Sequence, residues 1–221
     1  MNPTAGLEII ARRDKPKRVV GPDVASEMIQ SLRVDDQAIW GTVFYAGLRA
    51  GELQALRVED VELFDGWGLL HVRQSWDKVE GAIAPKPKAG TRQVPIPEPL
   101  YKILDEHLLR LGRTDGLIFG RTATEPFSYN AVRDRQRSQD GLQLHEGRHS
   151  YSSMLAAAGI PKERRDRYLG HADHSMDGRY THQLDPSYLD DAQTFSEYLR
   201  LADTPARVEM VRTSRAPVST S

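Results

Sequence analysis

The chain has 221 residues, a length that suits one domain with tails and allows a real hydrophobic core. It contains no cysteine, which excludes disulfides, thiolate metal ligands and a cysteine nucleophile. No apolar run approaches the roughly 20 residues of a membrane span, and residues 1–20 lack the apolar core of a signal peptide. The net charge of −1 excludes a uniformly basic protein, but cationic clusters still allow a basic face.

Helical patterns dominate the first part of the chain, after a charged, proline-containing linker at residues 1–20. A Gly-Pro-Asp step at residues 21–23 predicts the start of a helix that runs to about Leu32, because proline is favoured in the first turn. A second helix is predicted over residues 35–45, with an apolar stripe that faces the core. After a glycine-containing break, residues 52–57 are expected to form a short helix.

The apolar period changes between residues 58 and 96, where short apolar segments alternate with glycine-containing turns. We expect short antiparallel strands there, containing Val61, Leu63, Leu69, Leu70, Val72, Val79, Val94 and Ile96. Pro95 has no amide hydrogen to donate, so the last strand is expected at a sheet edge.

The remainder of the chain is predicted to be helical, with a disordered tail after residue 201. Helices are expected at residues 99–111, 128–137 with Ser128 as N-cap, 144–158, from Pro161 onward, and 187–201. The predicted fold class is therefore mainly α with a small antiparallel β-sheet (α+β).

A dense polar segment runs from His145 to His182 and contains five of the seven histidines. Its start, His-Glu-Gly-Arg-His, matches the H-E-x-x-H signature of zinc hydrolases, in which two histidines one turn apart share a metal and the glutamate is the base. The extended form of that signature fails, because Ser152 occupies its glycine position. The conceivable third ligand, Glu163, lies beyond a Gly-Ile-Pro break, so we favour a site without metal.

The same helix supports a second hypothesis. His145 and Arg148 project from one face, and the guanidinium of Arg148 is a fork of donors suited to two phosphate oxygens. His171 adds an imidazole, Tyr180 adds a hydroxyl, and Arg49 follows a helix break where its side chain can point into a cleft. Two arginines with histidines and a tyrosine indicate phosphoryl transfer through a covalent phosphotyrosine.

Taken together, these residues resemble the catalytic domain of the tyrosine recombinases, the family of phage integrases and of the recombinases that resolve chromosome dimers. Residues 44–53 (FYAGLRAGEL) resemble the first arginine box of that family, and residues 85–96 (PKPKAGTRQVPI) resemble its lysine hairpin. Residues 144–149 (LHEGRH) resemble its His-x-x-Arg box, and Leu-Gly-His at 169–171 with Tyr180 resembles its closing histidine and nucleophile. The resemblance covers roughly residues 20–200.

The resemblance implies the catalytic-domain fold of DNA breaking-rejoining enzymes over residues 21–201, and a site-specific recombinase or integrase that needs no cofactor. Its nucleophile would be Tyr180, which attacks the scissile phosphate to give a 3′-phosphotyrosine. Arg49, Arg148 and His171 would stabilise the phosphate oxygens. Lys86, favoured over Lys88, would be the general acid, and His145 would be the base that accepts the tyrosine proton.

The chain departs from the family pattern in three ways. Pro87 and Gly90 stand where the lysine hairpin commonly has hydroxyl residues. Gly147 replaces a bulkier apolar residue, which costs about 1 kcal/mol of helix propensity and is expected to loosen local packing. The N-terminal core-binding domain of the family is absent, so we interpret the chain as a truncated or naturally short form.

The implied partner is double-stranded DNA. A full-length protein is expected to form a homotetramer on DNA, and this fragment is expected to be a monomer. The implied location is the cytoplasm of a bacterium or phage-infected cell. Predicted DNA contacts are Lys88, Arg92, Arg133, Arg137 and Arg164. A type IB topoisomerase-like strand transferase and a DNA-binding module that no longer cuts are the alternatives.

Overall fold

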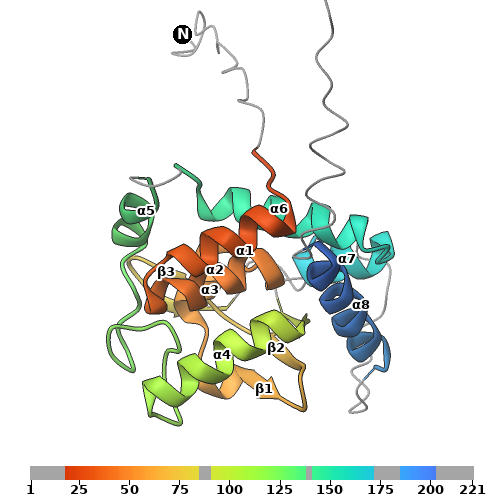
Figure 1. Ribbon diagram of the computed structural model, residues 1–221. Coiled ribbons are helices and arrows are strands. Elements are labelled where there is room, and N and C mark those ends of the chain that lie inside the picture. Colours follow the sequence, from red (N-terminus) through yellow and green to blue (C-terminus); the bar gives the residue numbers. More distant parts are fainter. Residues whose placement is uncertain (1–17, 85–90, 138–140, 172–184, 203–221) are drawn as a thin grey trace, which may run out of the picture.

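The computed structural model describes residues 18–84, 91–137, 141–171 and 185–202 (Figure 1). The helices are α1 (Pro22–Ser31), α2 (Val34–Ala46), α3 (Ala50–Ala55), the 3-10 helix η1 (Val58–Asp60), α4 (Glu98–Leu111), α5 (Tyr129–Arg137), α6 (Leu144–Ala157), α7 (Lys162–Leu169) and α8 (Ser187–Ala202). The strands are β1 (Val61–Leu63), β2 (Gly68–Val72), β3 (Ser75–Asp77), β4 (Gly81–Ile83) and β5 (Arg92–Ile96). The predicted fold class, mainly α with a small antiparallel sheet, is confirmed. Within these residues, no helix combines the length and apolar character needed to cross a membrane.

Helix α2 is the centre of the core, and α1, α4 and α6 pack around it. The predicted stripe of Ile39, Trp40, Val43 and Phe44 is buried, and the burial extends to every residue from 38 to 46, so more than one face of this helix is covered. Small residues explain the wider burial, because they let neighbouring helices approach the remaining faces. A Cβ on Gly41 would lie 3.1 Å from Cδ1 of Ile103 on α4, and the hydroxyl of Thr42 is satisfied within α2 by donating to the carbonyl of Ala38 at 2.8 Å.

The larger sheet has the order β1-β2-β5, with both pairs antiparallel, and β3 pairs with β4 in a separate hairpin. Leu70 on the central strand lies opposite Val61 on one side and Val94 on the other. Strand β5 is at an edge, as its proline predicts. The prediction of Val79 as a strand residue is wrong: it lies in the turn between β3 and β4 and is 92% exposed.

The remaining predicted helix signals agree with the structure. The hydroxyl of Ser128 accepts a hydrogen bond of 3.3 Å from the amide of Ala131 at the start of α5. Gly159 ends the turn after α6 with a φ of +83°, a conformation that glycine adopts without strain. Helix α8 then packs against β5, β2 and α4, which covers the sheet (Figure 1).

Gly147 brings α6 close to α2, which corrects the expectation that it loosens the packing. A Cβ at this position would lie 2.5 Å from Cγ1 of Val43, a distance that real Cβ contacts do not show. The glycine therefore permits the close approach of the helix that carries His145 and Arg148 to the central helix of the core.

We expect Gly147→Ala to destabilise the protein by about 1–3 kcal/mol, because the overpacking against Val43 outweighs the gain in helix propensity. Urea unfolding followed by circular dichroism measures the change. Ser153→Ala, at an exposed position of the same helix, is the matched control and should stay within about 0.5 kcal/mol of the wild type. A Gly147→Ala protein as stable as the control would contradict the close approach.

Candidate active site

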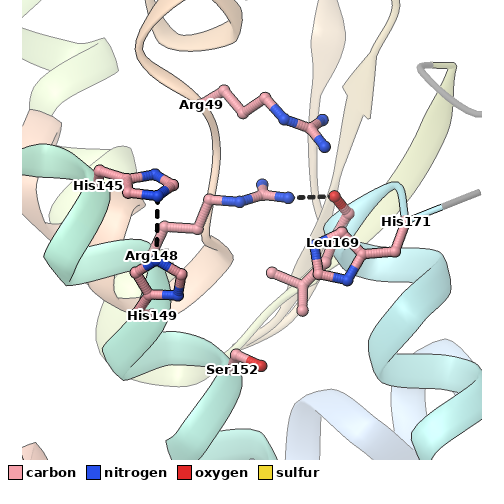
Figure 2. A pocket seen from close by; sticks show the side chains of 7 residues that line it. All are labelled: Arg49, His145, Arg148, His149, Ser152, Leu169 and His171. Carbon is pink, nitrogen blue, oxygen red and sulfur yellow. Dashed lines mark hydrogen bonds between the residues drawn. The ribbon is translucent and has the colours of Figure 1, made fainter. Parts of the chain in front are cut away.

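Four of the predicted catalytic residues line one pocket of about 150 Å³: Arg49, His145, Arg148 and His171. Figure 2 shows the two arginine side chains extending across the pocket between the histidine pair on α6 and the end of α7. His149, Ser152 and Leu169 complete the lining. Three segments that are far apart in the sequence thus meet here, as the phosphoryl-transfer hypothesis requires.

Arg148 is a buried cation held by backbone carbonyls. Its side chain projects from α6, and its two terminal nitrogens donate hydrogen bonds to the carbonyl oxygens of Gly47 and Leu169. Burial, reinforced by the nearby charge of Arg49, lowers the pKa of Arg148 to about 10, so it remains charged at neutral pH. A desolvated positive charge that is hydrogen-bonded to two neutral carbonyls favours an anion in the adjoining pocket.

Arg49 reaches the pocket from the turn between α2 and α3. Its backbone amide donates to Oε2 of Glu52 at 2.7 Å and its Nη1 donates to Oε1 at 2.8 Å, which fixes the first turn of α3. Its Nη2 donates to the carbonyl of Gly170 at 3.2 Å. With 46% of its side chain exposed, Arg49 can meet a ligand that arrives from solvent.

Glu52 and Arg92 form a buried bidentate ion pair that the sequence hypothesis missed. Both side chains are 3% exposed, with Nη1–Oε1 at 2.9 Å and Nη2–Oε2 at 2.8 Å. Nε of Arg92 also donates to the carbonyl of Tyr168 on α7 at 2.6 Å. Although burial opposes ionisation of Glu52, the hydrogen bonds and charge of Arg92, with the hydrogen bonds from Arg49, lower its pKa from 4.5 to about 2.

This geometry corrects the prediction that Arg92 contacts DNA, because its guanidinium is committed to the interior. A sequence signal was available. Arg92, Val94 and Ile96 are every second residue of β5, so the two-residue period of a strand places all three on the same buried face. The predicted DNA contact depended on the charge of Arg92 within the lysine-hairpin cluster and not on its position along the strand. Glu52 caps α3 from the third position of the helix, but the N-cap is Arg49 and not the Ser, Thr, Asp or Asn of the usual capping-box signature, so the sequence contains no such signal.

His171 is positioned by the end of α7. Gly170 adopts a left-handed conformation, with φ +60° and ψ +42°. The amide of His171 donates to the carbonyl of Asp166 at 3.0 Å, and the amide of Gly170 donates to that of Arg167 at 3.1 Å. This is the pattern of a Schellman motif, and it places the imidazole at the pocket.

Charged groups of both signs act on the pKa of the His171 imidazole, in opposite directions. Its Nδ1 lies 3.6 Å from Oδ1 of Asp166. Burial, followed by the charge of Arg148, lowers the pKa of His171, while Asp166 opposes that decrease. The histidine is therefore neutral near pH 7 while the pocket holds no anion.

His145 and His149 lie one turn apart on α6, with their Nε2 atoms 3.0 Å apart (Figure 2). The carboxylate of Glu146 is used elsewhere: its Oε2 accepts a hydrogen bond of 2.8 Å from the amide of Gln143 at the start of α6. Glu146 is therefore a capping residue, and it does not serve the pair as the base of a zinc hydrolase. In the part of the chain that the structure describes, no three His, Asp or Glu side chains are grouped to hold a metal.

The predicted DNA contacts have different environments. Arg133 on α5 pairs with its neighbour Asp134 and lines a hollow of about 370 Å³ with Tyr129 and Gln143. Arg137 is the last residue of α5. Arg164 on α7 lies 3.2 Å from Asp191 of α8 and is 30% exposed, which limits its freedom to reach a phosphate.

The predicted nucleophile Tyr180 and the lysines Lys86 and Lys88 lie outside the described residues, as do His174 and His182. The pocket described here therefore contains four of the six predicted catalytic residues.

A helical domain with a small antiparallel sheet and a pocket of two arginines and three histidines has the catalytic-domain fold of the tyrosine recombinases. The model of the phage integrase family matches residues 22–186, and the chain belongs to this family. This confirms the resemblance drawn from the sequence boxes.

Curated relatives agree with this assignment. The chain is 30% identical over 160 residues to the tyrosine recombinase XerC of Neisseria gonorrhoeae, covering 68% of this chain and 48% of the relative. It is 35% identical over 79 residues to the prophage integrase IntR of Escherichia coli, covering 36% of this chain and 19% of the relative. The chain thus spans about half or less of the length of these relatives.

Solved structures show the same fold. A Tn1549 transposon integrase in complex with a circular intermediate DNA matches with a TM-score of 0.57 and 16% identity, covering 74% of this chain and 61% of the other. The XerA recombinase matches with a TM-score of 0.55 and 21% identity, covering 94% and 67%.

The low pKa of Glu52 predicts a specific acid sensitivity. Because the carboxyl is more acidic in the folded than in the unfolded chain, its contribution to stability is complete above about pH 4.5 and is lost as the pH falls toward 2. A decrease from 4.5 to about 2 corresponds to roughly 3 kcal/mol.

Glu52→Gln should lower the free energy of unfolding at pH 7 by about 3–5 kcal/mol, since Arg92 is left buried without its counter-charge, and should flatten this acid limb. Urea unfolding between pH 2 and pH 7 measures both effects. Glu125→Gln, which removes an exposed pair with Arg121, is the control and should change stability by less than about 1 kcal/mol. Wild-type stability at pH 7 in Glu52→Gln would show that the pair does not hold the site together.

Proposed function

We propose that this chain is the catalytic domain of a site-specific DNA recombinase or integrase, which cleaves and rejoins DNA through a 3′-phosphotyrosine at Tyr180. The observation that carries the proposal is the pocket in which Arg49, Arg148 and His171 converge. Membership of the phage integrase family and the DNA-bound state of a neighbouring structure support DNA as the partner.

The pocket suits a phosphodiester that must become more negatively charged at its non-bridging oxygens. Arg148 approaches from the interior and Arg49 from the exposed rim, so two guanidiniums can hold one phosphate from two sides. Both are positioned by the protein before the substrate arrives, so little reorganisation is needed as charge develops. Removing one such donor from other enzymes costs about 10²–10³ in rate.

The covalent step exchanges one phosphate ester for another. The phenolic oxygen of Tyr180 bonds to phosphorus, the bond from phosphorus to the 5′-oxygen breaks, and that oxygen takes a proton, for which Lys86 is the proposed donor. Attack by the 5′-hydroxyl of a partner strand reverses the exchange. The ester energy stays in the protein–DNA bond, so the step balances without a nucleotide cofactor or a metal.

Histidines at the pocket would accept and donate the protons of the reaction. A free tyrosine has a pKa of about 10, so it needs a base, and we assign His145 to accept its proton. His171, neutral in the free protein, has an N–H to donate to a phosphate oxygen. The negative phosphate would itself favour protonation of His171 and so strengthen this hydrogen bond.

DNA would lie over the open side of the pocket. Arg133 and Arg137 on α5, with Lys88, are the proposed phosphate contacts, and Arg164 contributes only if its pair with Asp191 opens. Such contacts position the duplex without reading its sequence. A tetramer of full-length chains would bring two duplexes together for strand exchange.

The proposal is tested with nicked suicide DNA carrying the recombination site, incubated with the chain in EDTA. We expect a denaturant-resistant protein–DNA adduct that is lost in Tyr180→Phe. Tyr101→Phe, which alters a tyrosine on α4 outside both the pocket and the hollow beside α5, is the control and should retain the adduct. An adduct that persists in Tyr180→Phe would contradict the assignment of the nucleophile.

The other hypotheses give different results. A type IB topoisomerase-like enzyme would relax supercoiled DNA but exchange no strands between two labelled duplexes. A chain that binds the site in a gel-shift experiment but forms no adduct would be a DNA-binding module that no longer cuts.

A further inference from the structure

The histidine pair on α6 has a geometry that the proposed function does not use. The Nε2 atoms of His145 and His149 are 3.0 Å apart, and the ring centroids are 4.4 Å apart in an edge-on arrangement. Recombination gives a role to His145 alone. Both rings line the pocket, His145 is exposed and His149 is half-buried, so an ion from solvent can reach them.

The spacing of these nitrogens is close to that of a metal chelate. Zinc binds imidazole nitrogen at about 2.0–2.1 Å, so two histidines at a tetrahedral angle have their nitrogens about 3.3 Å apart. The observed 3.0 Å would need to open by only a few tenths of an ångström. Because both residues lie on one face of one helix, rotation of the side chains alone can turn both Nε2 atoms from their mutual hydrogen bond toward one ion.

We propose that His145 and His149 form a two-histidine site for a divalent cation of the class that prefers imidazole, Zn²⁺, Cu²⁺ or Ni²⁺. One of the two rings donates the Nε2–Nε2 hydrogen bond, so binding requires that ring to carry its proton on Nδ1 instead, which leaves both Nε2 lone pairs for the ion. Water or a small anion would fill the remaining coordination positions on the pocket side, where Arg49 and Arg148 favour an anionic ligand.

The ion would occupy the pocket as an inhibitor and would not take part in catalysis. Glu146, which would act as base in a zinc hydrolase, caps the start of α6. The ion would also occupy the space of the scissile phosphate. In addition, it would be coordinated by the lone pair with which His145, the proposed base, accepts the tyrosine proton. This second part of the inference rests on the proposed function, whereas the binding site does not.

Zn²⁺ titration of the metal-free chain by isothermal calorimetry tests the site. The measurement uses a His174→Gln/His182→Gln background, so that those two histidines cannot contribute. We expect one Zn²⁺ per chain and at least a tenfold loss of affinity in His149→Ala, since even an outer-shell partner is worth 10–100-fold. His71→Gln, a histidine on β2 outside the pocket, is the matched control and should retain the affinity.

Circular dichroism checks that His149→Ala is folded, and the electron paramagnetic resonance spectrum of bound Cu²⁺ counts the nitrogens. Two coordinating imidazoles in the background protein and one in His149→Ala support the site. Equal Zn²⁺ affinity of His149→Ala and its background, or no binding at 1 mM Zn²⁺, would overturn it. These readouts do not depend on DNA cleavage, so they separate failure of this site from failure of the proposed function.

Inhibition is measured separately. Zn²⁺ at a concentration that saturates the calorimetric site should suppress the suicide-DNA adduct, and EDTA should restore it. An adduct yield unaffected by saturating Zn²⁺ would overturn the inhibitory part.

Discussion

Several guanidiniums close together cannot be buried without a counter-charge, and Glu52 supplies that charge. Its carboxylate receives two hydrogen bonds from Arg92 and two from Arg49, and it adds a favourable charge near Arg148. The same contacts connect the first turn of α3 to β5 and, through the carbonyl of Tyr168, to α7. The contacts of Glu52 with Arg49 and Arg92 thus position the walls of the pocket and also neutralise part of its positive charge. Breaking a buried pair of this kind typically costs 3–5 kcal/mol, so we expect the pocket and the fold around it to depend on each other.

Helix ends supply the rest of the electrostatic support. Gly47 ends α2 and Gly170 ends α7, each in a left-handed conformation. The carbonyls exposed at these ends accept hydrogen bonds from Arg148 and Arg49. The C-terminus of a helix carries partial negative charge and stabilises nearby cations. Gly47 also makes space for the core, because a Cβ there would lie 2.2 Å from Cδ1 of Tyr151. Two glycines that the chain needs for turns therefore also hold the two arginines at the pocket.

Much of this arrangement could be predicted from the sequence, because it depends on local patterns. Helical periodicity and capping residues locate the helices to within two residues, and the boxes around Arg49, Arg148 and His171 indicate the site. The mistakes involve tertiary contacts. Charge alone predicts a DNA contact for Arg92, although its register on β5 places it inside. Helix propensity alone predicts looser packing at Gly147, although the short distance to Val43 shows close packing. β-Propensity alone predicts a strand at Val79, although its turn leaves it exposed. For Arg92 and Gly147, the residue that decides the outcome lies far away in the chain. For Val79, the geometry of the turn outweighs the β-propensity of valine.

Arg148 is held in place by two carbonyls, and we propose that this orients it to stabilise the phosphate in the transition state. Single-turnover cleavage of suicide DNA by Arg148→Lys tests it most directly, because lysine keeps the charge but cannot donate to both carbonyls and a phosphate in the same planar geometry. The account predicts a rate about 10²–10³ lower than wild type, with circular dichroism and DNA affinity little changed. A rate within tenfold of wild type in a folded, DNA-binding Arg148→Lys protein would contradict it.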